Sequence, residues 1–146
     1  MEQANQTTVK PKKIKLDFKE SKYATGRRKK SIARVWVKKG SGNIHVNGLK
    51  MNEYFKRPVH QIIVTRPLEI SEVSSGYDVK CSVKGGGLSG QAGAIILGIS
   101  NALISHDENL KKNLKKDKLT TRDSRVVERK KYGHRKARRS FQFSKR

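Results

Sequence analysis

The feature that most constrains this chain is the uneven placement of its charge. The 146 residues include 35 lysines and arginines but only 12 acidic residues, which gives a formal net charge of +23. Residues 40–110 hold six charges of each sign, whereas residues 21–39 hold eight cations and no acid, and residues 120–146 hold eleven cations and two acids. The basic stretches are too polar to bury a core of their own. The sequence therefore predicts one neutral folded body that carries basic extensions.

An excess of positive charge of this size opposes compaction unless a polyanion neutralises it. Nucleic acid is the first candidate for that polyanion, ahead of an anionic membrane surface or an acidic protein. The longest apolar run, residues 94–97, is too short to cross a membrane, so no membrane partner is expected. The single cysteine, Cys81, excludes an internal disulfide framework and a multi-cysteine zinc site. The four histidines are isolated in the sequence, so no metal and no cofactor are expected.

The hydrophobic pattern of the first half predicts a small sheet with helices. Residues 31–37 alternate as a strand, and a turn at residues 40–43 leads to a second alternation at residues 44–47, so we expect these two strands to form a hairpin. Residues 51–64 have helical spacing, which Pro58 should divide into two short helices. Residues 68–73 are interpreted as a further strand.

The second half contains the clearest strand of the chain, residues 77–84, with Tyr77, Val79, Cys81 and Val83 facing inward. A helix is predicted from about residue 89 to 105. Another is predicted over residues 107–116, with Asp107 and Glu108 in its first turn, where they complement the helix dipole. The order strand–strand–helix–strand–strand–helix–helix predicts an α+β domain of two layers, with helices on one face of a small sheet.

Two segments of the folded body are candidate phosphate contacts. Arg27, Arg28, Lys29 and Lys30 form a run of cations without a neighbouring acid, which suits a nucleic-acid backbone. Gly85, Gly86 and Gly87 lie between a strand and a helix, where glycine lets backbone amides approach a phosphate. The same pattern also fits a plain tight turn with close packing of helix on strand, and both interpretations stay open. The loop lacks the Gly-Lys-Ser/Thr of a Walker loop, which makes a phosphotransferase the weakest hypothesis.

Residues 120–146 are predicted to form an extended basic arm, because the hydrophobic periodicity fades from Thr120. Arginine can hold a phosphate through two parallel hydrogen bonds, and aromatic side chains among cations can stack on bases. A tail that only improves solubility has no use for Tyr132, Phe141 and Phe143. The arm is therefore a third candidate RNA contact.

At these residues the chain resembles the small-subunit ribosomal protein nine family of bacteria and organelles. The likeness is carried by ATGRRKKSIARVWVKKGSG at residues 24–42, by VKGGGLSGQAGAI at 83–95, and by TTRDSRVVERKKYGHRKARRSFQFSKR at 120–146. It covers about residues 22–146. Residues 1–21 are expected to be a polar extension outside the family core, residues 22–119 the globular domain, and residues 120–146 the arm.

The resemblance implies a fold like the second domain of ribosomal protein five, with a left-handed β-α-β crossover. It implies a structural role without catalysis in the head of the small subunit. The expected partners are small-subunit rRNA, peptidyl-site tRNA and neighbouring head proteins, with no small-molecule substrate. Carried onto this chain, the tRNA-proximal residues are Ser144, Lys145 and Arg146. The basic run, the glycine loop and the two phenylalanines of the arm would contact rRNA, together with Arg122, Arg125, Arg129, Lys130, Lys131, Arg135, Lys136, Arg138 and Arg139.

The alternative from another functional class is an RNA-binding regulator or chaperone that acts off the ribosome. It would be present at far fewer copies than ribosomes. The start of the chain carries acids and no arginine before Arg27, which favours a cytoplasmic ribosome over an organelle matrix.

Overall fold

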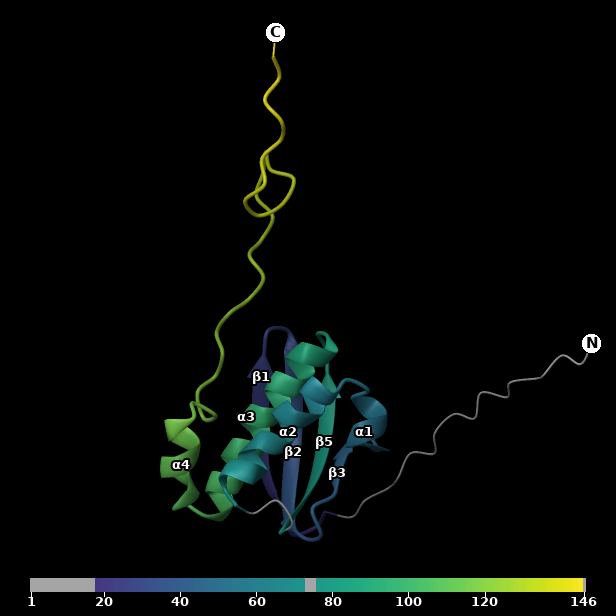
Figure 1. The fold of residues 1–146 in the computed structure, drawn as a ribbon, viewed down its shortest axis with the longest axis vertical. Helices are drawn as coiled ribbons and strands as arrows, with labels where there is room; N and C mark the ends of the chain where they lie inside the picture. The colour runs from purple at the N-terminus through teal and green to yellow at the C-terminus, as the bar shows by residue number, and fades with distance from the viewer. Residues whose placement is uncertain (1–17, 73–75, 146) are drawn as a thin grey trace, which may run out of the picture.

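The protein is described by a computed structural model, in which residues 18–72 and 76–145 are placed. Five strands form a single sheet in the order β1-β2-β5-β3-β4. The strands are β1 Lys22–Arg28, β2 Ser31–Lys39, β3 Ile44–Val46, β4 Leu49–Lys50 and β5 Tyr77–Lys84. The helices are α1 Met51–Tyr54, α2 Pro58–Ile70, α3 Leu88–His106 and α4 Leu110–Lys116. Figure 1 shows α2 and α3 lying over one face of the sheet, so the prediction of a mixed α+β domain is confirmed.

The core lies between the sheet and α3. The inward residues of β2 and β5 are buried as the alternation predicts, including Val35, Val37 and Val79, and they pack with Ile95 and Ile99 of α3. The length and apolar composition of α3 would also suit a membrane span, but 56% of its most apolar window is buried inside the protein. That burial is typical of the central helix of a domain.

The predicted hairpin between residues 31–37 and 44–47 is wrong. β2 pairs with β1 and β5, while β3 lies on the other side of β5 and runs parallel to it. The reason is Asp78 at the start of β5, whose carboxylate accepts hydrogen bonds from the backbone amides of Ser41 (3.0 Å) and Asn43 (2.9 Å). These bonds hold the loop across the end of β5. They also lower the pKa of Asp78, chiefly through the bond from the amide of Asn43.

Two other elements differ from the predictions. The strand expected at residues 68–73 is wrong where it can be judged, because α2 continues through Ile70 and buries Leu68 as a helical residue; Val73 lies outside the described residues. A short apolar run suits a helix as well as a strand. Asp107 and Glu108 precede α4, which begins at Leu110, and Asp107 instead accepts a hydrogen bond from the amide of Asn109 at 3.0 Å. Pro58 does separate two helices, as predicted.

β1 was not predicted from the sequence, yet it makes extensive contact with α3. Its inward positions are small because the helix comes close: a Cβ atom on Gly26 would overlap the carbonyl oxygen of Ala94 and lie 2.5 Å from the amide nitrogen of Gly98. The parallel pair β3 and β5 is joined through α1 and α2, which makes a crossover connection. The left-handedness expected for it stays a prediction.

Candidate nucleic-acid interface

The turn between β1 and β2 carries the run of four cations. Arg27 and Arg28 end β1, and Lys29 and Lys30 form the turn before Ser31 begins β2. Lys29 adopts a left-handed backbone conformation with a φ of 51°, which allows the tight reversal. The side chains of Arg27, Lys29 and Lys30 are exposed, whereas Arg28 is half-buried. Three of the four cations are thus open to a polyanion, and the fourth is held against the protein.

The glycine loop lies directly beside this turn. Gly85 and Gly86 have φ values of 74° and 61°, a region that favours glycine. The hydroxyl of Ser31 donates a hydrogen bond to the carbonyl of Gly85 at 3.1 Å, and a Cβ atom on Gly86 would overlap that hydroxyl. The interpretation as a tight, closely packed turn is therefore confirmed. The contact with phosphate stays a prediction.

Helix α3 begins immediately after the glycine loop, with Gly87 at its N-cap. No side chain of residues 18–72 or 76–145 caps this end, and the first turn contains no acidic residue. The first amides of an α-helix have no partner within the helix, and they attract an anion. Gln91 fixes the loop over this end by donating a hydrogen bond to the carbonyl of Gly85 (3.2 Å), while its amide oxygen accepts one from Tyr54 (2.8 Å).

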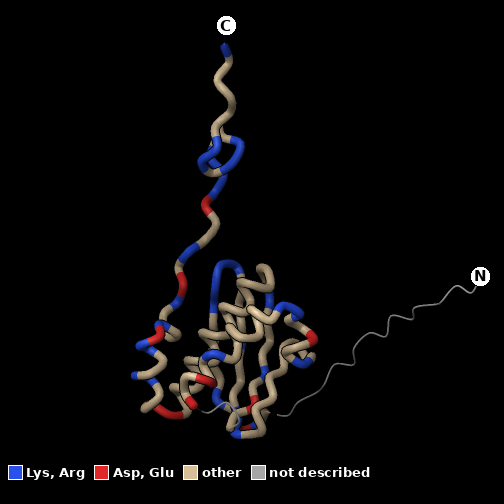
Figure 2. The backbone as a smooth tube through the Cα atoms, viewed as in Figure 1, with Lys and Arg blue, Asp and Glu red and all other residues tan. Residues whose placement is uncertain are grey.

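The basic turn, the glycine loop and the tail (residues 120–145, the predicted arm) meet at one cavity of about 630 Å³ next to the start of α3. From the domain it is lined by Lys29, Lys30, Gly86, Gly87, Ser89 and Gly90, and from the tail by Val126, Val127, Glu128 and Arg129. The structure therefore brings together three segments that the sequence could only treat separately. Figure 2 shows lysine and arginine gathered at the β1–β2 turn and along the tail.

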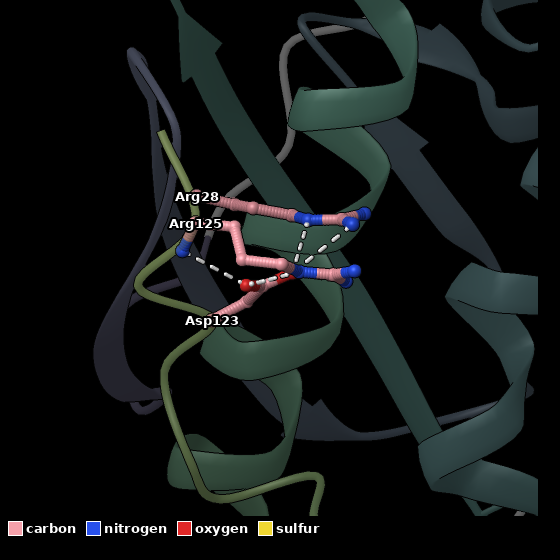
Figure 3. A network of polar contacts seen from close by, with 3 residues as sticks. All are labelled: Arg28, Asp123 and Arg125. Carbon is pink, nitrogen blue, oxygen red and sulfur yellow. Dashed lines mark hydrogen bonds and ion pairs between the residues drawn. The ribbon is translucent and has the colours of Figure 1, made fainter. Parts of the chain in front are cut away.

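Asp123 anchors the start of the tail to the domain (Figure 3). Its carboxylate accepts a hydrogen bond from Nε of Arg28 at 3.2 Å and pairs with the terminal nitrogen of the same guanidinium at 3.1 Å. It also accepts bonds from the backbone amide of Arg125 (3.1 Å) and from its guanidinium (2.9 Å). The bond from the Arg125 side chain is the largest reason why the pKa of Asp123 lies well below its usual range; the charge of Arg28 adds to it.

Beyond this anchor the tail is not extended throughout, in contrast to the expectation of a simple arm. Residues 131–140 form a loop that is closed by the hydrogen bond from the amide of Arg135 to the carbonyl of Arg139 (2.7 Å). Glu128 ties the loop to the preceding chain through ion pairs with Arg138 (2.8 Å) and Lys131 (3.2 Å). The bonds from these two residues, that of Arg138 first, lower the pKa of Glu128. The loop is visible within the tail in Figure 1.

The remaining predicted residues of the tail are open to solvent. Tyr132 and Phe143 are 93% and 88% exposed, and Phe141 is 59% exposed. The guanidinium carbon of Arg135 lies 5.5 Å from the centre of the Phe141 ring. Ser144 and Lys145 are exposed, and Arg146 lies outside the described residues. Also exposed are Arg122, Arg125, Arg129, Lys130, Lys131, Arg135, Lys136, Arg138 and Arg139.

Sequence reasoning missed the residues that organise these cations. Asp123 and Glu128 are the two acids of residues 120–146, and each is paired with arginine in the structure. Two lone acids in so basic a segment were the available signal for such a role. The lining of the cavity by Val126 and Val127 had no signal in the sequence, because it depends on the path of the tail past the glycine loop.

A mixed sheet-and-helix domain with a cation-lined helix N-terminus and a basic, aromatic-bearing tail defines a protein of the polyanion-binding class. The chain matches the family model described as Ribosomal protein S9/S16 over residues 26–146. It belongs to this family of small-subunit ribosomal proteins. It is therefore a ribonucleoprotein component that binds rRNA and acts in translation, and its family is generally non-enzymatic.

Proposed function

We propose that this protein is a structural component of the small-subunit head, where its basic turn and glycine loop bind the phosphates of the large RNA. The observation that carries the proposal is the cavity at the start of α3, at which exposed cations of the turn and the tail converge. The amides at the start of a helix and three cations that line the same cavity suit a phosphate of a folded RNA. A domain like the second domain of ribosomal protein five, with its left-handed crossover, is part of this proposal.

The tail extends the same contact towards peptidyl-site tRNA. Residues 120–145 carry exposed cations over most of their length, and Figure 1 shows the segment running away from the domain. We expect Phe141 and Phe143 to anchor the tail in RNA, so that Lys145 and Arg146 are held at the tRNA. Neighbouring head proteins are expected partners, and the expected location is the cytoplasmic ribosome.

The first test is sedimentation of the tagged protein from a lysate in low magnesium, which separates the ribosomal subunits. Stoichiometric migration with the small subunit through a moderate salt wash is expected. Protein that stays at the top of the gradient would overturn the proposal and favour an off-ribosome RNA-binding regulator.

The second test concerns the tip of the tail, residues 144–146. Removing residues 144–146 should leave assembly nearly intact but weaken the binding of peptidyl-site tRNA. A matched control is Lys38→Gln together with Lys39→Gln, which removes two exposed cations of β2 instead of the two at the tip. Equal tRNA affinity in ribosomes that carry the deletion and the control would show that the tip has no such role.

A further inference from the structure

The second face of the sheet, opposite the helices, is also built for binding. Because side chains alternate along each strand, the residues that do not face α3 point to this side. On the three neighbouring strands β1, β2 and β5 they include Tyr23, Arg27, Ile32, Arg34, Trp36, Lys80 and Lys84; we call this set the open sheet face. No helix of residues 18–72 and 76–145 lies on it, since α2 and α3 cover the other side (Figure 1).

Two aromatic rings and a lysine form a row across the open sheet face, and the ammonium of that lysine also lies 5.7 Å from the centre of the Phe18 ring. Tyr23 stands opposite Trp36 in the β1–β2 register, and Trp36 stands opposite Lys80 in the β2–β5 register. The centres of the Tyr23 and Trp36 rings are 5.3 Å apart, and the ammonium of Lys80 lies 5.9 Å from the centre of the Trp36 ring. Tyr23 is 49% exposed, although an aromatic ring on a strand normally gains by being covered. Ile32 on the same face is 46% exposed.

The charge of this face determines what kind of partner fits it. Arg27, Arg34 and Lys84 are exposed on the same face, between the aromatic row and the β1–β2 turn. The acid that β5 contributes to this side is Asp78, and its carboxylate is already occupied by the amides of the loop that follows β2. The face is therefore strongly positive, whereas the centre of a protein–protein interface is normally depleted of lysine and charge. A polyanion that also offers flat apolar surfaces matches both properties.

We infer that the open sheet face binds unpaired nucleotides of RNA, with a base stacked on Tyr23 beside Trp36 and the neighbouring phosphates held by Arg27, Arg34 and Lys84. Any base has a ring face that stacks on an aromatic side chain, and cations along the same surface follow the backbone. Bases inside a duplex are already stacked, so this surface selects single-stranded segments. The inference goes beyond the proposed function, because its aromatic residues belong neither to the cavity at α3 nor to the tail.

Trp36 is the single tryptophan of the chain, so its fluorescence reports directly on this face. The full-length protein is first saturated with a 12-base-pair RNA duplex, which occupies the sites that bind RNA through its phosphates alone. A 12-nucleotide oligouridylate is then added. Saturable quenching of Trp36 by the single strand, beyond that caused by the duplex, is expected. Absence of additional quenching would overturn the inference and leave the proposed function untouched.

Variants locate the contact. Tyr23→Leu should raise the oligouridylate concentration for half-quenching about tenfold, since stacking on one aromatic side chain has about that effect. Ile62→Ala, which removes an exposed apolar side chain of α2 on the other side of the sheet, is the control and should leave the value unchanged. Circular dichroism checks that both variants fold, and Arg34→Gln provides a second variant on the face. An unchanged value in both Tyr23→Leu and Arg34→Gln would refute the assignment.

A final experiment distinguishes an RNA partner from an acidic protein partner. Polyglutamate with the same number of charges replaces the oligouridylate in the titration. Weak or no quenching is expected, because the peptide has no ring to stack. Quenching as complete as that by RNA would show that the face recognises charge alone, and it would overturn the stacking assignment in favour of an acidic protein partner.

Discussion

Gly26→Ala tests whether the close approach of β1 to α3 holds the basic turn in place. The added Cβ atom would overlap the carbonyl oxygen of Ala94 and lie 2.5 Å from the amide nitrogen of Gly98. Both atoms belong to the backbone of α3, so no rotation of a side chain can relieve the clash. The helix and the strand must separate, which weakens the packing of β1 on α3.

The magnitude follows from the cost of overpacking a core, which is typically 1–3 kcal/mol. A clash with two backbone atoms places this substitution at the upper end, at about 3 kcal/mol. With a urea m-value of about 2 kcal/mol/M, the midpoint of unfolding falls by about 1.5 M. A loss of this size is a large part of the 5–15 kcal/mol that stabilises an ordinary domain.

Urea unfolding followed by Trp36 fluorescence measures the effect, because Trp36 lies on β2, the direct partner of β1. The matched control is Gly87→Ala: an added Cβ there meets no atom within 4 Å, and the φ of Gly87 is −109°. The control should cost only about 0.5–1 kcal/mol, since alanine is less favourable than glycine at a helix N-cap, and this is well below the loss expected for Gly26→Ala. If Gly26→Ala unfolds at the same urea concentration as Gly87→Ala, the close packing of β1 on α3 is not what stabilises this end of the fold.

Three further predictions concern single side chains. Asn47→Ala should destabilise the protein by about 2–3 kcal/mol in the same urea assay, because Asn47 exchanges two hydrogen bonds with the backbone of Val83 (2.8 and 3.1 Å) and has a φ of 52°. Asn52→Ala, at an exposed position, is the control. Equal stability of the two variants would contradict the role of Asn47. The carboxyl of Asp123 should titrate by NMR well below about 3.9, so the stabilisation it gives to the docked tail is fully present above that pH and is lost only as the pH falls through the lowered pKa. Arg125→Gln should raise this midpoint more than Arg28→Gln, and the reverse order would be evidence against the geometry around Asp123. Cys81 should react with a thiol reagent only on unfolding, because burial raises its pKa, and rapid labelling of the native protein would show that the β5 core is open.

The sequence predicts well those elements in which large apolar residues recur at regular spacing and pack into the core. β2, β5 and α3 alternate or repeat with large buried residues such as Val35, Val79 and Ile95. β1 gives no such signal, since its inward positions are Ala24 and Gly26: their small size serves the approach of α3 and resembles a loop composition. A turn-rich sequence between two apolar runs predicts a hairpin, but the fold uses Asp78 on a distant strand to carry the chain across β5.

The candidate site also has features that the sequence predicts and features that depend on the fold. Runs of charge are local, so the cations of the turn and the tail are visible in the sequence and are exposed in the structure. Their meeting at one cavity depends on the docking of Asp123 on Arg28, two residues separated by 95 positions along the chain. The open sheet face is invisible for a different reason: Tyr23, Trp36 and Lys80 are joined only by the register of three strands.

Under the proposed function, the two acids of the tail make RNA binding an exchange of partners. In the free protein Asp123 and Glu128 pair with Arg28, Arg125, Lys131 and Arg138, and they neutralise part of the charge that attracts nucleic acid. An RNA phosphate must compete with a carboxylate for each of these side chains. Only an RNA that supplies several phosphates at matching positions replaces all of the pairs at once. If the tail binds RNA as proposed, the carboxylates therefore disfavour short or poorly fitting polyanions.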